Sequence, residues 1–387
     1  MKKVAVIPLR AGSKGIPGKN KKKILGRPLY QWCLGEAIFS DLEEIYVFTD
    51  DEEILIQVEK EYNWAGKVKT LKRGEQNAND TASTEDAMLE FAEKINWDFD
   101  VISLLQATSP LTTKEDINSV LGKLFEQKSD SVLTVVKTKR FIWNENGESL
   151  NYDYLNRPRR QDFDGLIIEN GAVYASTKEQ FISSKNRLGG KISVVEMPED
   201  TLTEIDEYSD FVVIEKLLLN RLSANKLNPC KVELLVLDVD GVFTDGTVCV
   251  TGEREHTKTF SLRDGMGLEL VRQAGVDVVV MTSEISPIVK SRMEKLGITH
   301  LFMGVKDKYS RLNQFLLEKD LSRNQVAYVG DDVNDLVNLN SVCWSFCPND
   351  ATLQVKPYCD VILNNNGGDK AIREVTEFII KYNQRFK

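Results

Sequence analysis

The sequence is poor in the residues that imidazole and thiolate chemistry needs. Its 387 residues include only two histidines, His256 and His300, and six cysteines that form no Cys-x-x-Cys pair. This scarcity argues against histidine-based catalysis, a zinc site and a disulfide framework, so reduced thiols in a cytoplasmic protein are expected. Any bound metal is expected to be a hard cation held by carboxylates.

Long apolar runs are also missing, because none approaches the ~18 residues that a membrane span requires. The start resembles a signal peptide, but its apolar stretch is too short and is broken by Arg10. Neither the Gly-Lys-Ser/Thr ending of a P-loop nor the GxGxxG spacing of a dinucleotide site is present. The net charge is -9, yet residues 1–35 hold nine Lys/Arg and no Asp/Glu.

The first strand and the loop after it therefore carry the strongest charge signal. Residues 4–9 (VAVIPL) read as a buried strand, and Arg10-Ala-Gly-Ser-Lys-Gly-Ile-Pro-Gly-Lys-Asn20 follows. Its glycines allow close backbone approach to a ligand, and Arg10, Lys14 and Lys19 add charge suited to phosphate oxygens. A basic pocket on an acidic protein favours a polyphosphate ligand over bulk nucleic acid. The alternative is a solvated basic loop.

Strand-like and helical segments alternate along the whole chain, which predicts an α/β fold with mostly parallel sheets and helices on both faces. The polar stretch Ser223–Lys231 interrupts this alternation, so two domains are expected, residues 1–224 and 231–387. The expected strands are 4–9, 45–49, 101–105, 131–136, 172–175, 234–238, 276–281 and 326–329. The expected helices are 29–40, 52–63, 84–95, 114–127, 207–222, 265–274, 287–296, 309–319 and 369–382.

The opening loop and five later stretches resemble the sugar cytidylyltransferases, in particular the acylneuraminate branch. The five stretches are Leu71-Lys-Arg73 with the following Asn79-Asp-Thr-Ala-Ser83, Leu105–Leu111, Arg157–Asp162, Glu169–Tyr174 and Thr203–Asp206. The resemblance implies a Rossmann-like nucleotidyltransferase domain that binds CTP and an acidic sugar. The implied nucleotide-binding residues are Arg10, Gly12, Ser13, Lys19, Asn20, Arg73 and Ser83, with Arg10 and Lys19 catalytic. The implied sugar-binding residues are Gln106, Arg159, Arg160, Gln161 and Asn170.

Two details of this half also follow from the side chains themselves. A guanidinium fork suits a carboxylate, so Arg159 or Arg160 is a natural anchor for the acidic sugar, although a solvated basic turn is the alternative. Glu204 and Asp206 are one residue apart on an extended segment, so their side chains point the same way. They could hold Mg²⁺ against the triphosphate, as their counterparts in the family do; an acidic surface turn is the alternative.

The second half contains Asp238-Val-Asp240-Gly241 directly after the apolar run Leu234–Leu237. Thr282, Lys308 and Gly330-Asp331-Asp332-Val-Asn-Asp335 follow in order. This series resembles the haloacid dehalogenase (HAD) phosphatases, and the short gap between Asp240 and Thr282 resembles the capless members that act on Kdo 8-phosphate. The resemblance implies that Asp238 attacks phosphorus and that Asp240 handles the proton. It also implies that Thr282 anchors a phosphate oxygen and that Lys308 neutralises charge. The implied Mg²⁺ ligands are Asp238, Asp240 and Asp331. Glu284 stands where Kdo enzymes have arginine, which favours a nine-carbon sugar phosphate.

Together, these resemblances imply an enzyme with two Mg²⁺-dependent active sites. One makes a CMP-sugar from CTP and a nonulosonic acid, and the other hydrolyses the 9-phosphate of that acid. The resemblance also implies a homotetramer, and no nucleic acid or membrane partner is expected. One alternative makes the second half a non-catalytic oligomerisation module. Another keeps both activities on Kdo, legionaminic or pseudaminic acid.

Overall fold

The computed structural model describes residues 1–13, 15–78, 82–227, 230–252 and 254–386. The chain divides into two compact units. Unit 1 comprises Met1–Ile24 and Pro28–Leu217, and unit 2 comprises Leu25–Arg27 and Leu218–Lys387. The units are described separately below. Among the described residues, no helix is both long and apolar enough to span a membrane.

Unit 1 is built on a seven-stranded sheet, counted over its described residues, with strand order β5-β4-β1-β6-β8-β7-β9. Strands β5, β4, β1 and β6 are parallel, whereas β8 runs antiparallel to both β6 and β7. A parallel pair of β7 and β9 closes the sheet. The bounds are β1 Lys3–Leu9, β4 Glu44–Thr49, β5 Val68–Lys72, β6 Val101–Leu105, β7 Ser131–Thr138, β8 Leu166–Thr177 and β9 Ile192–Met197. Strands β2 (Lys23–Ile24) and β3 (Arg27–Pro28) form a separate short pair.

Helices cover both faces of this sheet, as the alternation of buried residues in β1 requires. Ala5, Ile7 and Leu9 pack in one apolar cluster with residues of α1, α2 and α4. Val4 and Val6 pack in the opposite cluster with residues of α3 and α5. The helices are α1 Leu29–Ile38, α2 Glu52–Glu61, α3 Thr84–Lys94, α4 Lys114–Glu126, α5 Lys178–Ser184 and α6 Tyr208–Ser223.

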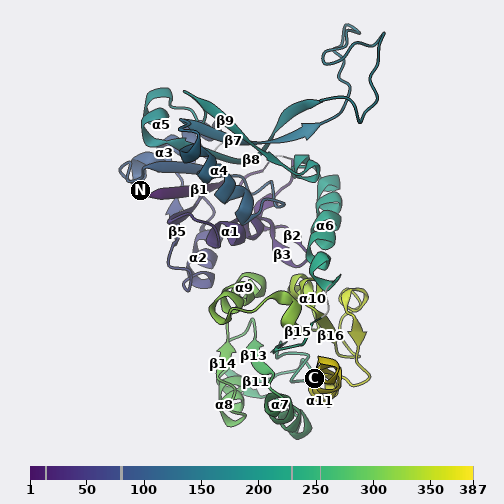
Figure 1. The fold of residues 1–387 in the computed structure, drawn as a ribbon. Coiled ribbons are helices and arrows are strands. Elements are labelled where there is room, and N and C mark those ends of the chain that lie inside the picture. Colours follow the sequence, from purple (N-terminus) through teal and green to yellow (C-terminus); the bar gives the residue numbers. More distant parts are fainter. Residues whose placement is uncertain (14, 79–81, 228–229, 253, 387) are drawn as a thin grey trace. The chain divides into compact units, whose positions relative to one another are not determined.

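The connection between β7 and β8, residues 139–165, is called the arm. Figure 1 shows it at the end of these two strands, extending beyond the rest of the sheet of unit 1. Aromatic rings pack within it, with Phe141 against Tyr152 and Phe163, and Trp143 against Tyr152 and Tyr154. The arm therefore has a small apolar centre of its own.

Unit 2 has a fully parallel sheet, six-stranded over its described residues, in the order β14-β13-β10-β15-β16-β17. Helices α7, α8 and α11 contribute to an apolar cluster with Leu235 and Leu237 of the central strand. The strands are β10 Leu234–Leu237, β13 Asp277–Met281, β14 His300–Phe302, β15 Val326–Val329, β16 Trp344–Cys347 and β17 Val361–Ile362. The helices are α7 Leu262–Gln273, α8 Pro287–Lys295, α9 Lys308–Lys319, α10 Leu336–Ser341 and α11 Ala371–Asn383. A hairpin of β11 (Cys249–Thr251) and β12 (Arg254–Thr257) lies between β10 and α7.

The predicted fold class, α/β with parallel-rich sheets in two parts of the chain, is confirmed. The predicted domain limits, 1–224 and 231–387, stay a prediction.

Candidate functional sites

A cavity of about 560 Å³ lies at the carboxyl ends of the parallel strands of unit 1, where such sheets place their ligand sites. Residues from the loops after β1, β5 and β6 and from the start of α3 surround it. Its lining includes the predicted residues Arg10, Ser13, Lys19, Asn20, Arg73, Gln106 and Asp206, together with Pro8, Gly15, Ile16, Ala82, Thr84, Ala87, Ala107 and Thr108. The loop that the sequence singled out thus forms one wall of a cleft.

Hydrogen bonds within this loop and to neighbouring segments fix its shape. Asn20 is buried, and its Nδ2 donates to the carbonyl of Arg10 at 3.2 Å. The backbone N–H of Ala11 donates to Asp50 at 2.8 Å. The Lys19 ammonium donates to the carbonyl of Ile205 at 2.7 Å and lies 3.4 Å from Asp206 Oδ1. Two cationic side chains, Arg10 and Lys19, are therefore presented at one mouth of the cavity.

Arg73, which follows β5, adds a third cation to the cavity lining. Its side chain is buried and donates to the carbonyl of Asn77, whereas its Nε has no hydrogen-bonding partner among the described residues. A buried guanidinium with an unpaired donor is costly unless a ligand accepts from it. An anion in the cavity would supply that acceptor.

Other predicted nucleotide-binding positions have different surroundings. Ser83 and Gly12 are exposed and do not line the cavity, and the Ser83 hydroxyl forms a capping box with Asp86 at the start of α3. Lys14 and the segment Asn79–Thr81 lie outside the described residues.

Glu204 and Asp206 offer hard oxygen ligands beside Lys19. Burial and the neighbouring charge of Asp206 raise the pKa of Glu204, and the ammonium of Lys19 opposes that rise. A bound divalent cation would relieve the same repulsion, so the donor chemistry of this pair fits Mg²⁺.

The predicted sugar-binding residues separate into two places. Gln106 lines the cavity, and Asn170 is fully buried in β8, where Nδ2 donates to Thr201 at 3.1 Å and Oδ1 lacks a partner among the described residues. Arg159, Arg160 and Gln161 are exposed on the arm instead. The two arginines line a second cavity of about 620 Å³ with Lys139, Arg140, Phe141, Arg157 and Pro158.

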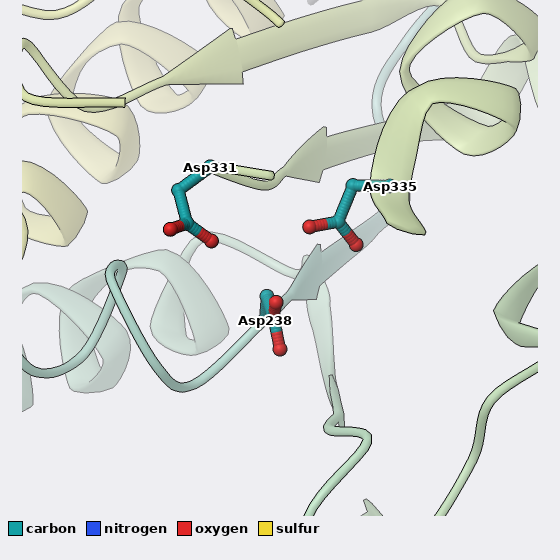
Figure 2. Close-up of side chains that lie close together, drawn as sticks. All are labelled: Asp238, Asp331 and Asp335. Carbon is teal, nitrogen blue, oxygen red and sulfur yellow. The ribbon is translucent and has the colours of Figure 1, made fainter. Parts of the chain in front are cut away.

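In unit 2, three carboxylates converge at the carboxyl ends of β10 and β15. Oxygen atoms of Asp238, Asp331 and Asp335 all lie within 4.8 Å of one another. Figure 2 shows Asp238 at the end of its strand with the other two side chains directed toward it. Gly241 has a φ of +80°, and a Cβ there would lie 2.0 Å from Asp331 Oδ2, so only glycine allows this approach.

One buried ammonium is shared by two of these acids. Lys308 Nζ lies 2.7 Å from Asp238 Oδ2 and 2.8 Å from Asp335 Oδ1, and Tyr328 donates to the same Asp335 oxygen at 2.6 Å. Asp335 Oδ2 is buried without a hydrogen-bonding partner among the described residues. Three carboxylates facing one ammonium leave excess negative charge, which fits a divalent cation bound through oxygen.

The pKa values of Asp238, Asp331 and Lys308 reflect this excess of acidic groups. Burial raises the pKa of Asp238 to about 7, against the pull of Lys308. Burial and the charges of Asp335 and Asp238 raise the pKa of Asp331 to about 8. Burial lowers the pKa of Lys308, but the two carboxylates outweigh that effect and raise the pKa above its ordinary value.

The other predicted phosphatase residues lie in the loops after β10 and β13. Thr282 is buried at the end of β13, and its hydroxyl accepts from the N–H of Glu284 at 3.2 Å. The Glu284 side chain is 64% exposed and lies 3.5 Å from Lys306. Asp240 is absent from the trio and instead pairs with Lys258 at 2.5 Å.

Sequence reasoning did not select two residues of this site. Asp335 belongs to the motif Gly330–Asp335 but was not chosen as a metal ligand, although its spacing of four from Asp331 was a usable signal. Tyr328 carried no signal, because an aromatic residue in an apolar strand reads as core.

Comparisons with known proteins give matches to both parts of the chain. The family model described as "Cytidylyltransferase" matches residues 4–226. N-acylneuraminate cytidylyltransferase A of Danio rerio is 32% identical over 395 residues, covering 99% of this chain and 90% of the relative. The 3-deoxy-D-manno-octulosonate 8-phosphate phosphatase of Haemophilus influenzae is 33% identical over 150 residues, covering 39% of this chain and 83% of the relative.

A solved structure of the Moraxella catarrhalis phosphatase of that name, in complex with magnesium, phosphate and KDO, is 29% identical. The match covers 44% of this chain and 94% of that one, with a TM-score of 0.39. On the sequence matches, the chain belongs to the cytidylyltransferase family and, over a part of its length, to the 3-deoxy-D-manno-octulosonate 8-phosphate phosphatase family.

Proposed function

We propose that this chain transfers CMP from CTP to a nonulosonic acid of the N-acylneuraminate type and also hydrolyses the 9-phosphate of such an acid. Residues 1–224 would carry the first reaction and residues 231–387 the second, both in the cytoplasm. The observation that supports the first activity is the cation-lined cavity of unit 1. The observation that supports the second is the acid trio with its buried lysine.

In the first reaction, the anomeric hydroxyl of the sugar acid attacks the α-phosphorus of CTP. The new O–P bond forms as the bond to pyrophosphate breaks, and the hydroxyl proton leaves to solvent or a base. Arg10, Lys19 and Arg73 line the cavity and would bind the triphosphate oxygens, so that positioning and charge neutralisation carry most of the catalysis. Glu204 and Asp206 would hold Mg²⁺, which would neutralise phosphate charge when bound.

The sugar-binding side of this reaction involves both the cavity and the arm. Gln106 would contact the sugar from the cavity, while buried Asn170 would support that wall from β8. Arg159, Arg160 and Gln161 lie on the arm and do not line the cavity of their own unit. The proposal therefore includes a dimer of the first half, in which the arm of a second copy brings its guanidinium groups to the sugar carboxylate.

In the second reaction, the Asp238 carboxylate attacks the phosphorus of the sugar phosphate, and the P–O bond to the sugar breaks. Asp240 would give a proton to the leaving oxygen, while Lys308 and Thr282 hold phosphate oxygens and orient Asp238. Water then attacks the phosphoaspartate and releases inorganic phosphate. Asp238, Asp331 and Asp335 would hold Mg²⁺, which would neutralise the charge on the transferring group. Glu284 would face the sugar and repel a carboxylate placed near it.

The test is an assay of the purified full-length chain with Mg²⁺. Pyrophosphate release is followed with CTP and a panel of free sugar acids, and phosphate release is followed with the corresponding sugar acid phosphates. We expect the highest kcat/KM in both assays for the nine-carbon acid and its 9-phosphate. Greater activity on Kdo and its 8-phosphate would contradict the substrate assignment.

The second half could instead act only as an oligomerisation module. The acid trio argues against that alternative, because a structural module has no need of three clustered carboxyl groups, two of which are buried and share one ammonium. We propose a homotetramer in either case, which light scattering at micromolar concentration would test. A monomer would contradict the proposed assembly and, with it, the proposed role of the arm of a second copy in binding the sugar carboxylate.

A further inference from the structure

Lys258 occupies a position that the proposed chemistry has not yet used. It directly follows β12, the second strand of the hairpin inserted between β10 and α7. Its side chain is only 3% exposed, and its Nζ lies 2.5 Å from Asp240 Oδ1. The Asp240 side chain retains 33% exposure. A buried ammonium thus holds a carboxylate that stays accessible from outside.

This contact decides where Asp240 points. Rotation about the last torsion of an aspartate is broad, so a carboxyl group without a fixed partner samples many orientations. A charge-assisted hydrogen bond to a side chain that is itself immobilised by burial removes that freedom. Asp240 is two residues from Asp238, yet it is not part of the trio whose oxygens lie within 4.8 Å of one another. The bond to Lys258 accounts for that separation.

We propose that Lys258 is a positioning residue for the phosphatase reaction, because it binds one oxygen of Asp240 and keeps the carboxyl group directed at the leaving sugar oxygen instead of the cation site. The inference rests on the phosphatase activity proposed for unit 2. Lys258 donates to Oδ1, and the transferred proton is carried by Oδ2. As the Asp238–P bond forms and the P–O bond to the sugar breaks, that proton moves to the sugar oxygen.

The consequence depends on the leaving group. A sugar alkoxide is a poor leaving group and needs a proton, whereas 4-nitrophenolate leaves without one. Misdirecting Asp240 should therefore impair hydrolysis of a sugar phosphate far more than hydrolysis of an aryl phosphate. General acid catalysis typically contributes about 10² to 10⁴ in rate, which sets the scale of the expected difference.

The experiment uses the full-length chain in three forms besides wild type. Lys258→Met keeps the length and apolar stem of the side chain but removes the charge, and Lys258→Arg restores a donor. Lys381→Met, at an exposed position of α11, is the matched control. Each form is assayed with N-acetylneuraminic acid 9-phosphate and with 4-nitrophenyl phosphate, and Mg²⁺ binding is measured by calorimetry.

We expect Lys258→Met to lower kcat for the sugar phosphate by about 10²-fold and kcat for 4-nitrophenyl phosphate by less than about 3-fold, given the usual size of general acid catalysis. Lys258→Arg should recover much of the sugar-phosphate activity, and Lys381→Met should match wild type. Equal losses on both substrates, or no loss on either, would overturn the inference while leaving the phosphatase activity standing. If Lys258→Met fails to fold, Lys258→Arg provides the test, and equal losses of kcat for the sugar phosphate and for 4-nitrophenyl phosphate in that variant would overturn the inference. A wild-type chain that hydrolyses neither phosphate overturns the proposed function and this inference with it.

Discussion

The cavity of unit 1 is lined by cationic side chains, whereas the proposed phosphate site of unit 2 is built from three carboxyl groups. In unit 1, Arg10, Lys19 and Arg73 line an open cavity, so cationic side chains can meet a triphosphate directly. In unit 2, Asp238 and Asp335 pair with buried Lys308 and Asp331 lies close to both, so the acidic side chains of the site outnumber the cation that pairs with them. The first arrangement suits binding of a polyanion. The second fits a divalent cation, and we propose that such a cation binds before the phosphate.

This difference has a physical root in what each site must do. Transfer of CMP uses a nucleophile that the substrate brings, so the protein supplies charge and position. In the phosphatase mechanism proposed above, a protein carboxylate is the nucleophile, and a carboxylate next to phosphate would need compensation from Lys308 and a cation. Each prediction below concerns one of these two sites.

The largest effect is expected for Asp238→Asn. The amide has nearly the same shape but is a very weak nucleophile, so phosphate release from the sugar acid 9-phosphate should fall by roughly 10⁴-fold or more. CMP transfer should stay within error of wild type when pyrophosphate release is measured. A phosphatase rate close to that of wild type would rule out Asp238 as the nucleophile.

Lys19→Met is expected to have the next largest effect, on the other reaction. Removing one preorganised cation from a site of charge development typically costs about 10² to 10³ in kcat, and we expect a loss of that order in CMP-sugar formation. Lys21→Met is the matched control, because Lys21 pairs with Asp51 and Glu53 outside the cavity lining. If the two variants lose equal activity, the specific role of Lys19 fails.

Tyr328→Phe should weaken the cation site of unit 2 without removing a ligand. The hydroxyl fixes Asp335 Oδ1, which leaves Oδ2 for the cation, and loss of such a supporting bond typically costs about 10- to 100-fold in metal affinity. Titration calorimetry with Mg²⁺ measures this directly. Unchanged affinity would show that Lys308 alone orients Asp335.

The smallest effect is a dependence of stability on pH. Burial raises the pKa of Asp238 to about 7 and of Asp331 to about 8, so the metal-free folded protein holds protons that the unfolded chain has released. Their contribution to stability is therefore full below about pH 4 and is lost as the pH rises toward 8. In EDTA we expect the Tm of wild type to fall over this range by a few degrees more than that of Asp331→Asn.

Mg²⁺ should reverse that loss, because a cation that binds only the folded state stabilises it and displaces the protons. The increase in Tm with Mg²⁺, measured by calorimetry, should be larger at pH 8 than at pH 5. A larger increase at pH 5 would contradict the assignment of the trio as the cation site.

Much of the fold could be predicted from local pattern. Central strands such as β1 and β10 are short apolar runs, and helices such as α4 begin at a capping box that the sequence displays as Thr113 and Asp116. Strands β5 and β9, at the two edges of the sheet, were not predicted, because β5 has no fully buried residue and β9 has only two, Ser193 and Met197, so neither is a continuous apolar run. The antiparallel direction of β8 was also not predicted, since a long connection such as the arm carries no signal of direction.

The site residues show the same contrast between what local sequence pattern reveals and what depends on tertiary packing. Residues in short motifs directly after a strand, such as Arg10 and Lys19, Asp238, or Asp331, could be found because the turn after one strand places each of them. Lys258 and Tyr328 could not, because their partners lie 18 and 7 residues away and depend on how a hairpin or a strand packs. The arm arginines were identified as anion-binding residues, but their distance from the cavity lining required the structure.

The packing of Trp143 gives the arm an optical property. Its indole is 46% exposed and its Nε1 donates to the Tyr152 hydroxyl at 2.9 Å, within the ring cluster that also contains Phe141, a lining residue of the basic cavity. An indole in this position emits at a wavelength that depends on how much water surrounds it. If a sugar acid or another copy of the chain covers the arm, the emission of Trp143 should shift to shorter wavelength. Binding to the arm could then be followed by the intrinsic fluorescence of the unlabelled protein.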